Sequence, residues 1–264
     1  MTQKISKQPV LTARKVSLGK PDSWRLQPMS LNLNSGEILA VCGPNGAGKS
    51  TLLGLLTGEL QPSGGEVLVA NKPLNAWPAA ELARCRSRME QSTPLSFDFL
   101  TEEVVALGRY AWGDDTADSP LVAEAMQAAG AYELLGRKIT RLSGGEQQRV
   151  QLARVLAQIW NVPNALLLLD EPMSAQDLGQ QQQVFRHLKK LVKQHNWSLV
   201  CVLHDLNLAS VFADRLLLLD KGEVKAVGTP AEVLDLPRVS SIYNAELIAY
   251  HHAESNRSLV MLDD

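Results

Sequence analysis

The chain has 264 residues, a formal net charge of −2, 45% apolar residues and 20% charged residues. This composition is typical of an ordinary globular protein that is long enough to bury a sizeable core. The near-neutral charge implies no strongly basic face, so we expect no nucleic-acid partner.

The sequence predicts neither a secretion signal nor a membrane span. Its first residues, MTQKISKQPVLTARK, have no apolar signal core, and the longest aliphatic run, at 165–169, is far too short to cross a bilayer. Cys42, Cys85 and Cys201 have no CxxC spacing, which favours a reducing cytosol. We expect Cys42 and Cys201 to be buried. We therefore expect a soluble chain that acts at a membrane only through a partner.

Short apolar runs alternate with helical patterns along the chain. Strands are predicted at 38–42, 165–169, 199–203 and 215–219, and helices at 49–57, 145–159, 178–195 and 205–212. Most of these strands are nearly continuous in apolar residues, as in strands buried on both faces of a parallel sheet. The pattern predicts an α/β fold with a mainly parallel sheet. A further short helix is expected after Thr229 and Pro230.

The segment 92–158 differs from the rest, because it has helical periodicity and little strand signal. Thr101 and the pair Ser119-Pro120 are helix-start signals within it. We expect a single domain over 1–264, in which 1–91 and 159–264 form the core and 92–158 is an inserted helical subdomain.

A phosphate-binding loop follows the first predicted strand. GPNGAGKST matches the pattern GxxxxGK[ST] in full, between an apolar strand and a leucine-rich helix. Its glycines let backbone N–H groups surround a polyphosphate, and Lys49 would reach the β- and γ-phosphates while Ser50 binds Mg²⁺. The alternative, a glycine turn without a ligand, does not explain the lysine, the serine and the flanks. The predicted nucleotide-binding residues here are Gly43, Pro44, Asn45, Gly46, Ala47, Gly48, Lys49, Ser50 and Thr51.

A second glycine pair lies in LSGGEQQR, at 142–149. Ser143 is an N-cap candidate, and Gly144 and Gly145 expose backbone N–H groups at a helix start, with Glu146 following. The stretch can bind a phosphate but lacks the lysine that would complete a site. Two incomplete sites suggest that two antiparallel copies share two ATP molecules, with this stretch of one chain over the ATP of the other.

The run ALLLLDEP ends a predicted buried strand in two carboxylates. Asp170 could hold Mg²⁺, and Glu171, which points elsewhere, could polarise an attacking water. Alone, such an acidic pair could equally cap a helix, but a phosphate loop in the same chain favours catalysis.

His204 follows the predicted strand 199–203. A lone histidine at a strand end is usually structural. If the strand lies beside the phosphate-loop strand, however, His204 faces the nucleotide and can hydrogen-bond the γ-phosphate. The other histidines are expected at the surface, without a metal or heme role: His187, His195, His251 and His252.

The order and spacing of GPNGAGKST, LSGGEQQR, LLLLDEP and VLHDLN resemble the ATP-binding subunits of ABC transporters over about 10–250. The resemblance implies a P-loop NTPase core with antiparallel β elements near the N-terminus, a helical subdomain, ATP and Mg²⁺ as ligands, and a head-to-tail homodimer. It also places Gln91 at the glutamine-loop position, which contacts Mg²⁺ and water. SAQD, at 174–177, takes the position of the dimer-contact loop.

The sequence departs from the family pattern at two places. Gln176 replaces the leucine of the usual SALD, so we expect a working loop with altered packing. Leu18 stands where an adenine-stacking tyrosine is common, and Trp24 is the substitute candidate.

More locally, ELARCRSRMEQSTPLSFDFLTEEVVALGR resembles the iron-chelate, heme and cobalamin importer branch. QLARVLAQIW, followed by VLHDLNLASVFADRLLLLDKGEVKAVGTPAEVL, resembles the hemin-importing members of that branch. This resemblance implies two permease subunits, an indirect link to a periplasmic binding protein, and a peripheral place on the cytoplasmic face of the inner membrane. Ferric-siderophore or cobalamin import is the alternative. A soluble ABC ATPase outside transport, or an adaptor that binds ATP without hydrolysis, fits the sequence less well.

Overall fold

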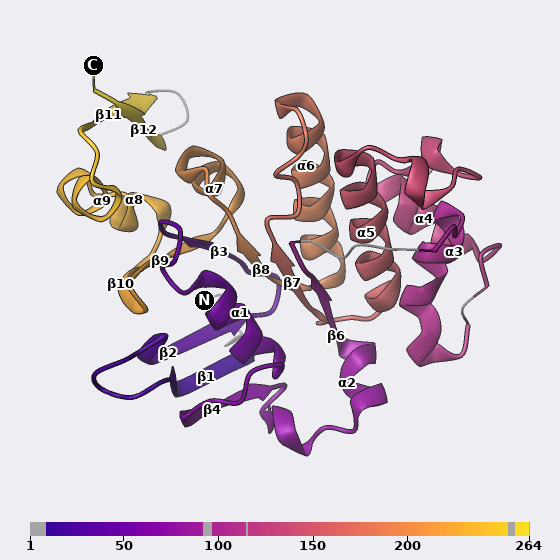
Figure 1. Ribbon diagram of the computed structural model, residues 1–264, viewed down its shortest axis with the longest axis horizontal. Coiled ribbons are helices and arrows are strands. Elements are labelled where there is room, and N and C mark those ends of the chain that lie inside the picture. The colour runs from indigo at the N-terminus through magenta and orange to yellow at the C-terminus, as the bar shows by residue number, and fades with distance from the viewer. Residues whose placement is uncertain (1–8, 92–96, 115, 253–256, 264) are drawn as a thin grey trace, which may run out of the picture. The chain divides into compact units, whose positions relative to one another are not determined.

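The structure, a computed structural model, describes residues 9–91, 97–114, 116–252 and 257–263. The chain divides into two compact units. The first unit is formed by Met1–Ala76 and Val200–Asp264, and the second unit by Trp77–Leu199. Figure 1 labels their helices and strands.

An antiparallel sheet of four strands lies in the first unit, in the order β2-β1-β4-β5. Its strands are β1 Pro9–Leu18, β2 Leu26–Asn34, β4 Gly64–Val69 and β5 Lys72–Pro73. On β2 the alternate residues Met29, Leu31 and Leu33 are buried while their neighbours face outward, as expected of a sheet with one covered face. The expected antiparallel elements near the N-terminus are thus confirmed.

A second group of strands in this unit contains the predicted parallel strands, in the order β10-β9-β3-β8. The strands are β3 Ile38–Cys42, β8 Ser198–Val202, β9 Arg215–Asp220 and β10 Glu223–Gly228, with β8 running on from the second unit. β9 pairs parallel with β3 and antiparallel with β10. β3 and β8 are buried at every position, which explains their unbroken apolar sequence.

Two side chains fix the start of β3. The Asp214 carboxylate accepts a hydrogen bond from the Ile38 N–H at 2.9 Å, and Glu37 pairs with Arg215 at 2.8 Å. Both contacts join residues about 180 positions apart in sequence to the beginning of β3. They hold the register of β3 against β9, and with it the position of the loop that follows β3.

The remaining elements of the first unit are helices and a terminal hairpin. They are α1 Lys49–Thr57, α7 Leu206–Phe212, α8 Pro230–Val233, α9 Leu236–Tyr243, β11 Leu247–His252 and β12 Arg257–Leu262. α1 has the predicted bounds, and α8 is the short helix expected after Thr229.

The second unit combines a parallel strand pair with a group of helices. Its elements are α2 Ala79–Cys85, β6 Arg86–Met89, α3 Thr101–Ala106, α4 Pro120–Ala128, α5 Gly144–Ile159, β7 Leu166–Asp170 and α6 Leu178–His195. β6 runs parallel to β7, and α3 and α4 both pack on α5. Val104, Met126 and Leu152 are fully buried in this helix group.

The helical character of the middle segment is confirmed. α3 begins at Thr101 and α4 at Pro120, as the start signals predicted, and the described residues between 97 and 159 form helices and turns with one isolated bridge, Leu100 to Lys138. The second unit extends beyond this segment on both sides, since it also contains β6, β7 and α6. The boundaries of the subdomain at 92 and 158 remain a prediction. Among the described helices, none is both long and apolar enough to cross a membrane.

Candidate active site

The loop GPNGAGKST joins β3 to α1 in the first unit. Gly43 has φ 150°, and a Cβ there would lie 2.2 Å from the Leu219 carbonyl oxygen. Gly48 has φ 104°, and a Cβ there would lie 3.0 Å from the carbonyl oxygen of Arg25. Only glycine allows both the left-handed backbone and this close packing, so the two glycines set the path of the loop.

Lys49 and the start of α1 give the loop its positive character. The Lys49 side chain is buried, and its Nζ donates to the carbonyl oxygens of Gly43 and Pro44 at 2.8 and 3.0 Å. No side chain caps the helix at Gly48, and the first backbone N–H groups of a helix have no acceptor within the helix itself. An uncapped helix start beside an ammonium group is a binding place for a phosphate.

The two cysteines expected in the core are buried. Cys42 ends β3 immediately before the loop, and its burial raises the pKa of the thiol to about 12. The thiol therefore stays protonated at neutral pH and packs as a small apolar side chain.

His204 lies where the sequence placed it. β8 neighbours β3, and the Leu203 N–H donates to the Val41 carbonyl oxygen at 3.1 Å. His204 follows and is exposed, beyond the end of the strand beside the loop-bearing strand. Asp205 then caps α7 by accepting from the N–H groups of Asn207 and Leu208. This cap fixes the turn that carries His204, and the sequence did not single it out.

The paired carboxylates lie in the second unit, where β7 ends. Asp170 is buried, whereas Glu171 is partly exposed and has φ 48°. The left-handed conformation costs about 1 kcal/mol for a residue with a Cβ, and it turns Glu171 out of the strand direction. Gln91 Nε2 donates to Glu171 Oε2 at 2.9 Å, so two of the predicted catalytic residues, 80 positions apart, contact each other.

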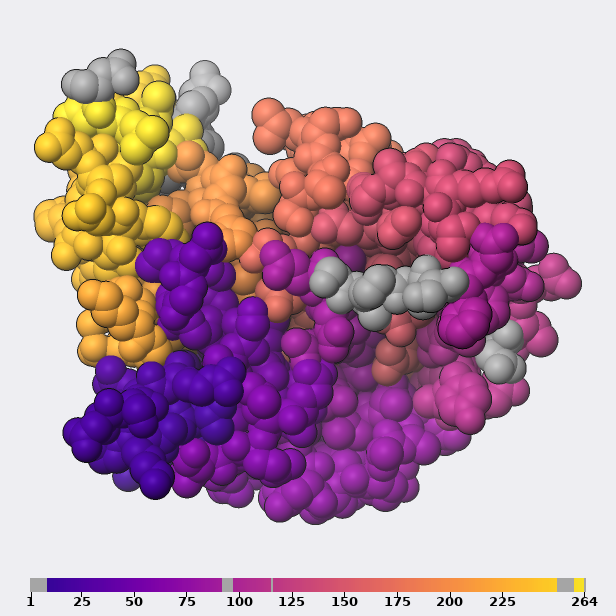
Figure 2. Space-filling model, in the orientation of Figure 1, coloured from indigo at the N-terminus to yellow at the C-terminus, as the bar shows by residue number. Residues whose placement is uncertain are grey.

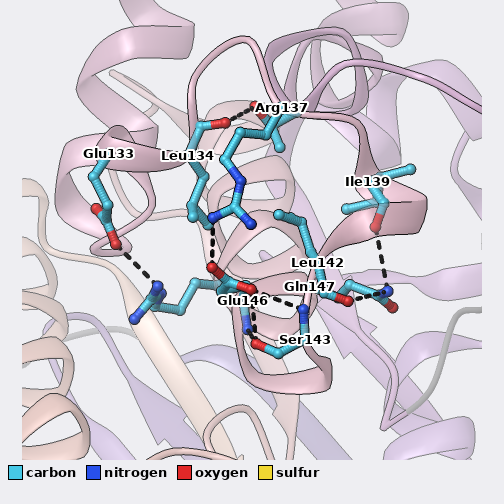
Figure 3. A network of polar contacts seen from close by, with 10 residues as sticks. Glu133, Leu134, Arg137, Ile139, Leu142, Ser143, Glu146 and Gln147 are labelled. Carbon is cyan, nitrogen blue, oxygen red and sulfur yellow. Dashed lines mark hydrogen bonds and ion pairs between the residues drawn. The ribbon is translucent and has the colours of Figure 1, made fainter.

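The stretch LSGGEQQR begins α5 in the second unit (Figure 3). Ser143 is its N-cap: Ser143 Oγ accepts from the Glu146 N–H at 3.3 Å, while the Ser143 N–H and O–H donate to Glu146 Oε2, both at 2.8 Å. This is a complete capping box. The hydrogen bonds from Ser143, together with Arg137 Nη1 at 2.6 Å, lower the pKa of Glu146 to about 2.

The helix start is also tied to the loop SAQD. Gln148 donates to Ser174 Oγ at 3.0 Å and accepts from the Ala175 N–H at 3.1 Å. A Cβ on Gly145 would lie 2.6 Å from Gln176 Nε2, so the amide that replaces the usual leucine packs against this glycine. Asp177 caps α6 by accepting from the Gln180 N–H. Arg137 and Gln148 were not predicted, because each contacts residues that no local pattern connects to it.

The model of the ABC transporter family matches residues 26–174, which is more than half of the chain. The chain belongs to the ABC transporter family. A hemin import ATP-binding protein of Escherichia coli O157:H7 is 44% identical over 237 residues, or 89% of this chain and 92% of that protein. This ABC protein is therefore an ATP-binding protein whose ATPase activity is coupled to transport.

Solved structures support the same fold. A metal-chelate type ABC transporter in an inward-facing conformation matches with a TM-score of 0.79 and 26% identity, over 97% of this chain and 98% of that chain. The dimeric, post-hydrolysis state of an ATP-binding cassette bound to ADP and Pi matches with a TM-score of 0.71 and 28% identity, over 83% and 98%. The predicted P-loop NTPase fold class is confirmed.

Proposed function

We propose that this chain is the ATP-hydrolysing subunit of a bacterial ABC importer that takes up hemin across the inner membrane. The observation that carries this proposal is the 44% identity with a hemin import ATP-binding protein along nearly the whole of both chains. Ferric-siderophore or cobalamin import would use the same ATPase mechanism, and the experiment below separates these substrates.

The nucleotide would bind at residues 43–51. Lys49 would exchange the carbonyl oxygens of its own loop for the β- and γ-phosphates, which are stronger acceptors for an ammonium group. The uncapped first turn of α1 would hold the same phosphates through backbone N–H groups.

Magnesium would accompany the nucleotide, with Ser50, Gln91 and Asp170 as its protein ligands. Mg²⁺ is usually bound through one or two carboxylates, substrate phosphates and water; Asp170 would supply the carboxylate, and Ser50 and Gln91 would add neutral oxygens. When bound, Mg²⁺ neutralises charge on the phosphates. The described residues contain no cluster of three or more His, Cys, Asp or Glu that could hold a metal by itself.

Hydrolysis would depend on Glu171 as the base that polarises water. Its strained backbone and its contact with Gln91 are the kind of arrangement found where a side chain must be held in one direction. His204 and Lys49 would stabilise the negative charge that develops on the γ-phosphate.

A second copy of the chain would complete each site. Ser143, Gly144, Gly145 and Glu146 of one copy would cover the ATP of the other, in a head-to-tail homodimer with two ATP molecules. The similarity to a dimeric ATP-binding cassette supports this assembly.

The permease would bind mainly to the helical segment. From residue 97 on, the helical segment (magenta to rose) forms part of the surface in Figure 2, and several of its large apolar side chains are exposed. They are Phe97, Phe99, Leu107, Tyr110, Tyr132 and Leu135. We propose two permease subunits as partners, an indirect link to a periplasmic binding protein, and a peripheral place on the cytoplasmic face of the inner membrane.

The decisive experiment reconstitutes the chain with its co-expressed permease in lipid and measures ATP hydrolysis with binding proteins loaded with hemin, a ferric siderophore or cobalamin. Stimulation by the hemin-loaded protein alone supports hemin import. Stimulation by another loaded protein instead overturns the assignment of hemin as the substrate. If none of the loaded proteins stimulates hydrolysis, coupling to this class of import is contradicted. The Glu171→Gln complex, which should not turn over, is the matched control.

A further inference from the structure

The Glu146 carboxylate is the centre of a compact polar network at the start of α5 (Figure 3). One of its oxygens, Oε2, accepts from both the N–H and the hydroxyl of Ser143. The other, Oε1, accepts from Arg137 Nη1, which reaches it from the turn that precedes the helix. In the single chain, therefore, the proton of the Ser143 hydroxyl is directed to Glu146.

In the proposed dimer, the Ser143 hydroxyl must donate its hydrogen bond to a different acceptor, the γ-phosphate. A serine hydroxyl has one proton, so it donates to one strong acceptor at a time. If Ser143 binds the γ-phosphate of the ATP on a second copy, the phosphate must replace Glu146 as the acceptor of this hydrogen bond. Both acceptors are anions that would lie within reach of one hydroxyl, so they also repel each other.

Arg137 lies where it can weaken the hydrogen bond between Ser143 and Glu146 and so favour the hydrogen bond to the phosphate. Its guanidinium neutralises the carboxylate and draws electron density to Oε1, which weakens Oε2 as an acceptor. Arg149 is paired with Glu133 at 2.9 Å, and Arg137 is the cation that pairs with Glu146.

The network also lies where a second chain could meet it. The side chains of Arg137 and Glu146 are 46% and 24% exposed, so the ion pair borders solvent rather than the core. Water screens such a pair in the single chain, and exclusion of water on dimerisation would strengthen it.

We propose that Arg137 is a positioning residue for ATP-driven dimerisation: it holds and neutralises Glu146, so that the Ser143 hydroxyl passes from Glu146 to the γ-phosphate on the second copy. This inference rests on the proposed head-to-tail dimer, and it adds a residue outside LSGGEQQR to that site.

The test measures ATP-dependent dimerisation of the full chain by analytical ultracentrifugation. All variants carry Glu171→Gln, which is expected to slow hydrolysis and to preserve the ATP-bound dimer. Arg137→Met should weaken each site by about fivefold or more, hence by about 25-fold for a symmetric dimer with two sites. Binding of ATP to the dilute single chain should not change, because Lys49 and its loop are untouched. Lys138→Met is the matched control. It removes the same charge from the adjacent residue, which forms a surface ion pair with Asp98, and it should not change dimerisation.

A second-site change separates this role from a merely structural one. In the double variant Arg137→Met with Glu146→Gln, the negative charge of Glu146 is absent and needs no neutralising cation. The dimer affinity should therefore return to within about twofold of that of the parent. Were Arg137 only a support for the turn, the double variant would stay as weak as Arg137→Met, which overturns the inference. Glu146→Gln alone should associate more tightly than the parent, since Arg137 then faces the phosphate unopposed. This variant decides the matter if Arg137→Met fails to fold.

The parent chain keeps the two proposals distinguishable. If the Glu171→Gln parent forms no dimer with ATP and Mg²⁺, the proposed assembly fails. If the parent dimerises and Arg137→Met dimerises equally tightly, only the role of Arg137 is refuted.

Discussion

The two glycine-rich helix starts of this protein differ in how their backbone donors are satisfied. α1 begins at Gly48 without a side-chain cap, whereas α5 begins at Ser143 with a complete capping box. The first start therefore has no side-chain acceptor at its N-cap, and an ammonium group lies beside it. At the second start, the Glu146 carboxylate already accepts from the N–H and the hydroxyl of Ser143. A helix start of the first kind can bind a nucleotide by itself, whereas one of the second kind must exchange an internal partner for it.

The glycines differ in the same way. Gly43 and Gly48 have positive φ angles and lie against backbone carbonyl oxygens, so they are required by the fold of the loop. Gly144 lacks a positive φ, and a Cβ there would meet no atom within 4 Å. The comparison indicates that Gly43 and Gly48 serve the structure of the chain itself, while Gly144 leaves space for another molecule.

The largest expected effect tests whether the helix start at α1 binds the nucleotide while Glu171 drives its hydrolysis. Glu171→Gln removes the proposed base, so turnover should fall by about 100-fold or more. ATP binding by the loop at 43–51 should be retained, since Lys49 is unchanged. Steady-state ATP hydrolysis and equilibrium nucleotide binding check the two halves of this prediction, and undiminished turnover would show that another group is the base.

The next effect compares the two kinds of glycine directly. Gly43→Ala places a methyl group against the Leu219 carbonyl, which should cost about 2 kcal/mol or more and lower the Tm by about 4 °C or more. Gly144→Ala should leave the Tm within about 1 °C, because nothing surrounds the added Cβ. It should nevertheless weaken ATP-dependent dimerisation. Thermal melts of both variants test the pair, and an equal loss of Tm would remove the distinction between them.

A smaller effect measures what the cap on α5 contributes. Ser143→Ala removes the hydroxyl that accepts from the Glu146 N–H, which should cost about 1 kcal/mol and about 3 °C in Tm. No such loss is expected at α1, where Ser50→Ala removes no cap. Urea unfolding of the two variants gives the comparison, in which a larger loss for Ser50→Ala is the contrary result.

The smallest effect is a pH dependence of the cap. The pKa of Glu146, about 2, lies below its ordinary value of 4.5, so the ionised carboxylate adds stability above pH 4.5 and loses it as the pH falls toward 2. The difference in unfolding free energy between the wild type and Glu146→Gln should therefore be present at pH 7 and shrink below about pH 4. Urea midpoints at several pH values check this, and a difference that grows on acidification would be the wrong sign.

Much of the fold could be predicted because its signals are local. α1 has the predicted bounds, and α5, α6 and α7 begin within one residue of the predicted positions. Elements that bury little were missed. α2 has no buried residue, and the β11–β12 hairpin keeps Ile248 and Tyr250 exposed. With no buried residue, α2 leaves no hydrophobic period in the sequence, and the hairpin, which buries Val260, leaves only a weak one.

The sequence by itself determined the chemical parts: the loop at 43–51, the carboxylates at the end of β7, and the N-cap at Ser143. Each depends on neighbouring residues, so its spacing is visible in the chain. Only the tertiary structure decided which distant groups act on these parts. It brings Gln91 to Glu171 and Arg137 to Glu146, and it fastens Gln148 to Ser174. Such contacts depend on the path of the backbone, including the left-handed turn at Glu171, and packing rather than local preference holds a residue in that conformation.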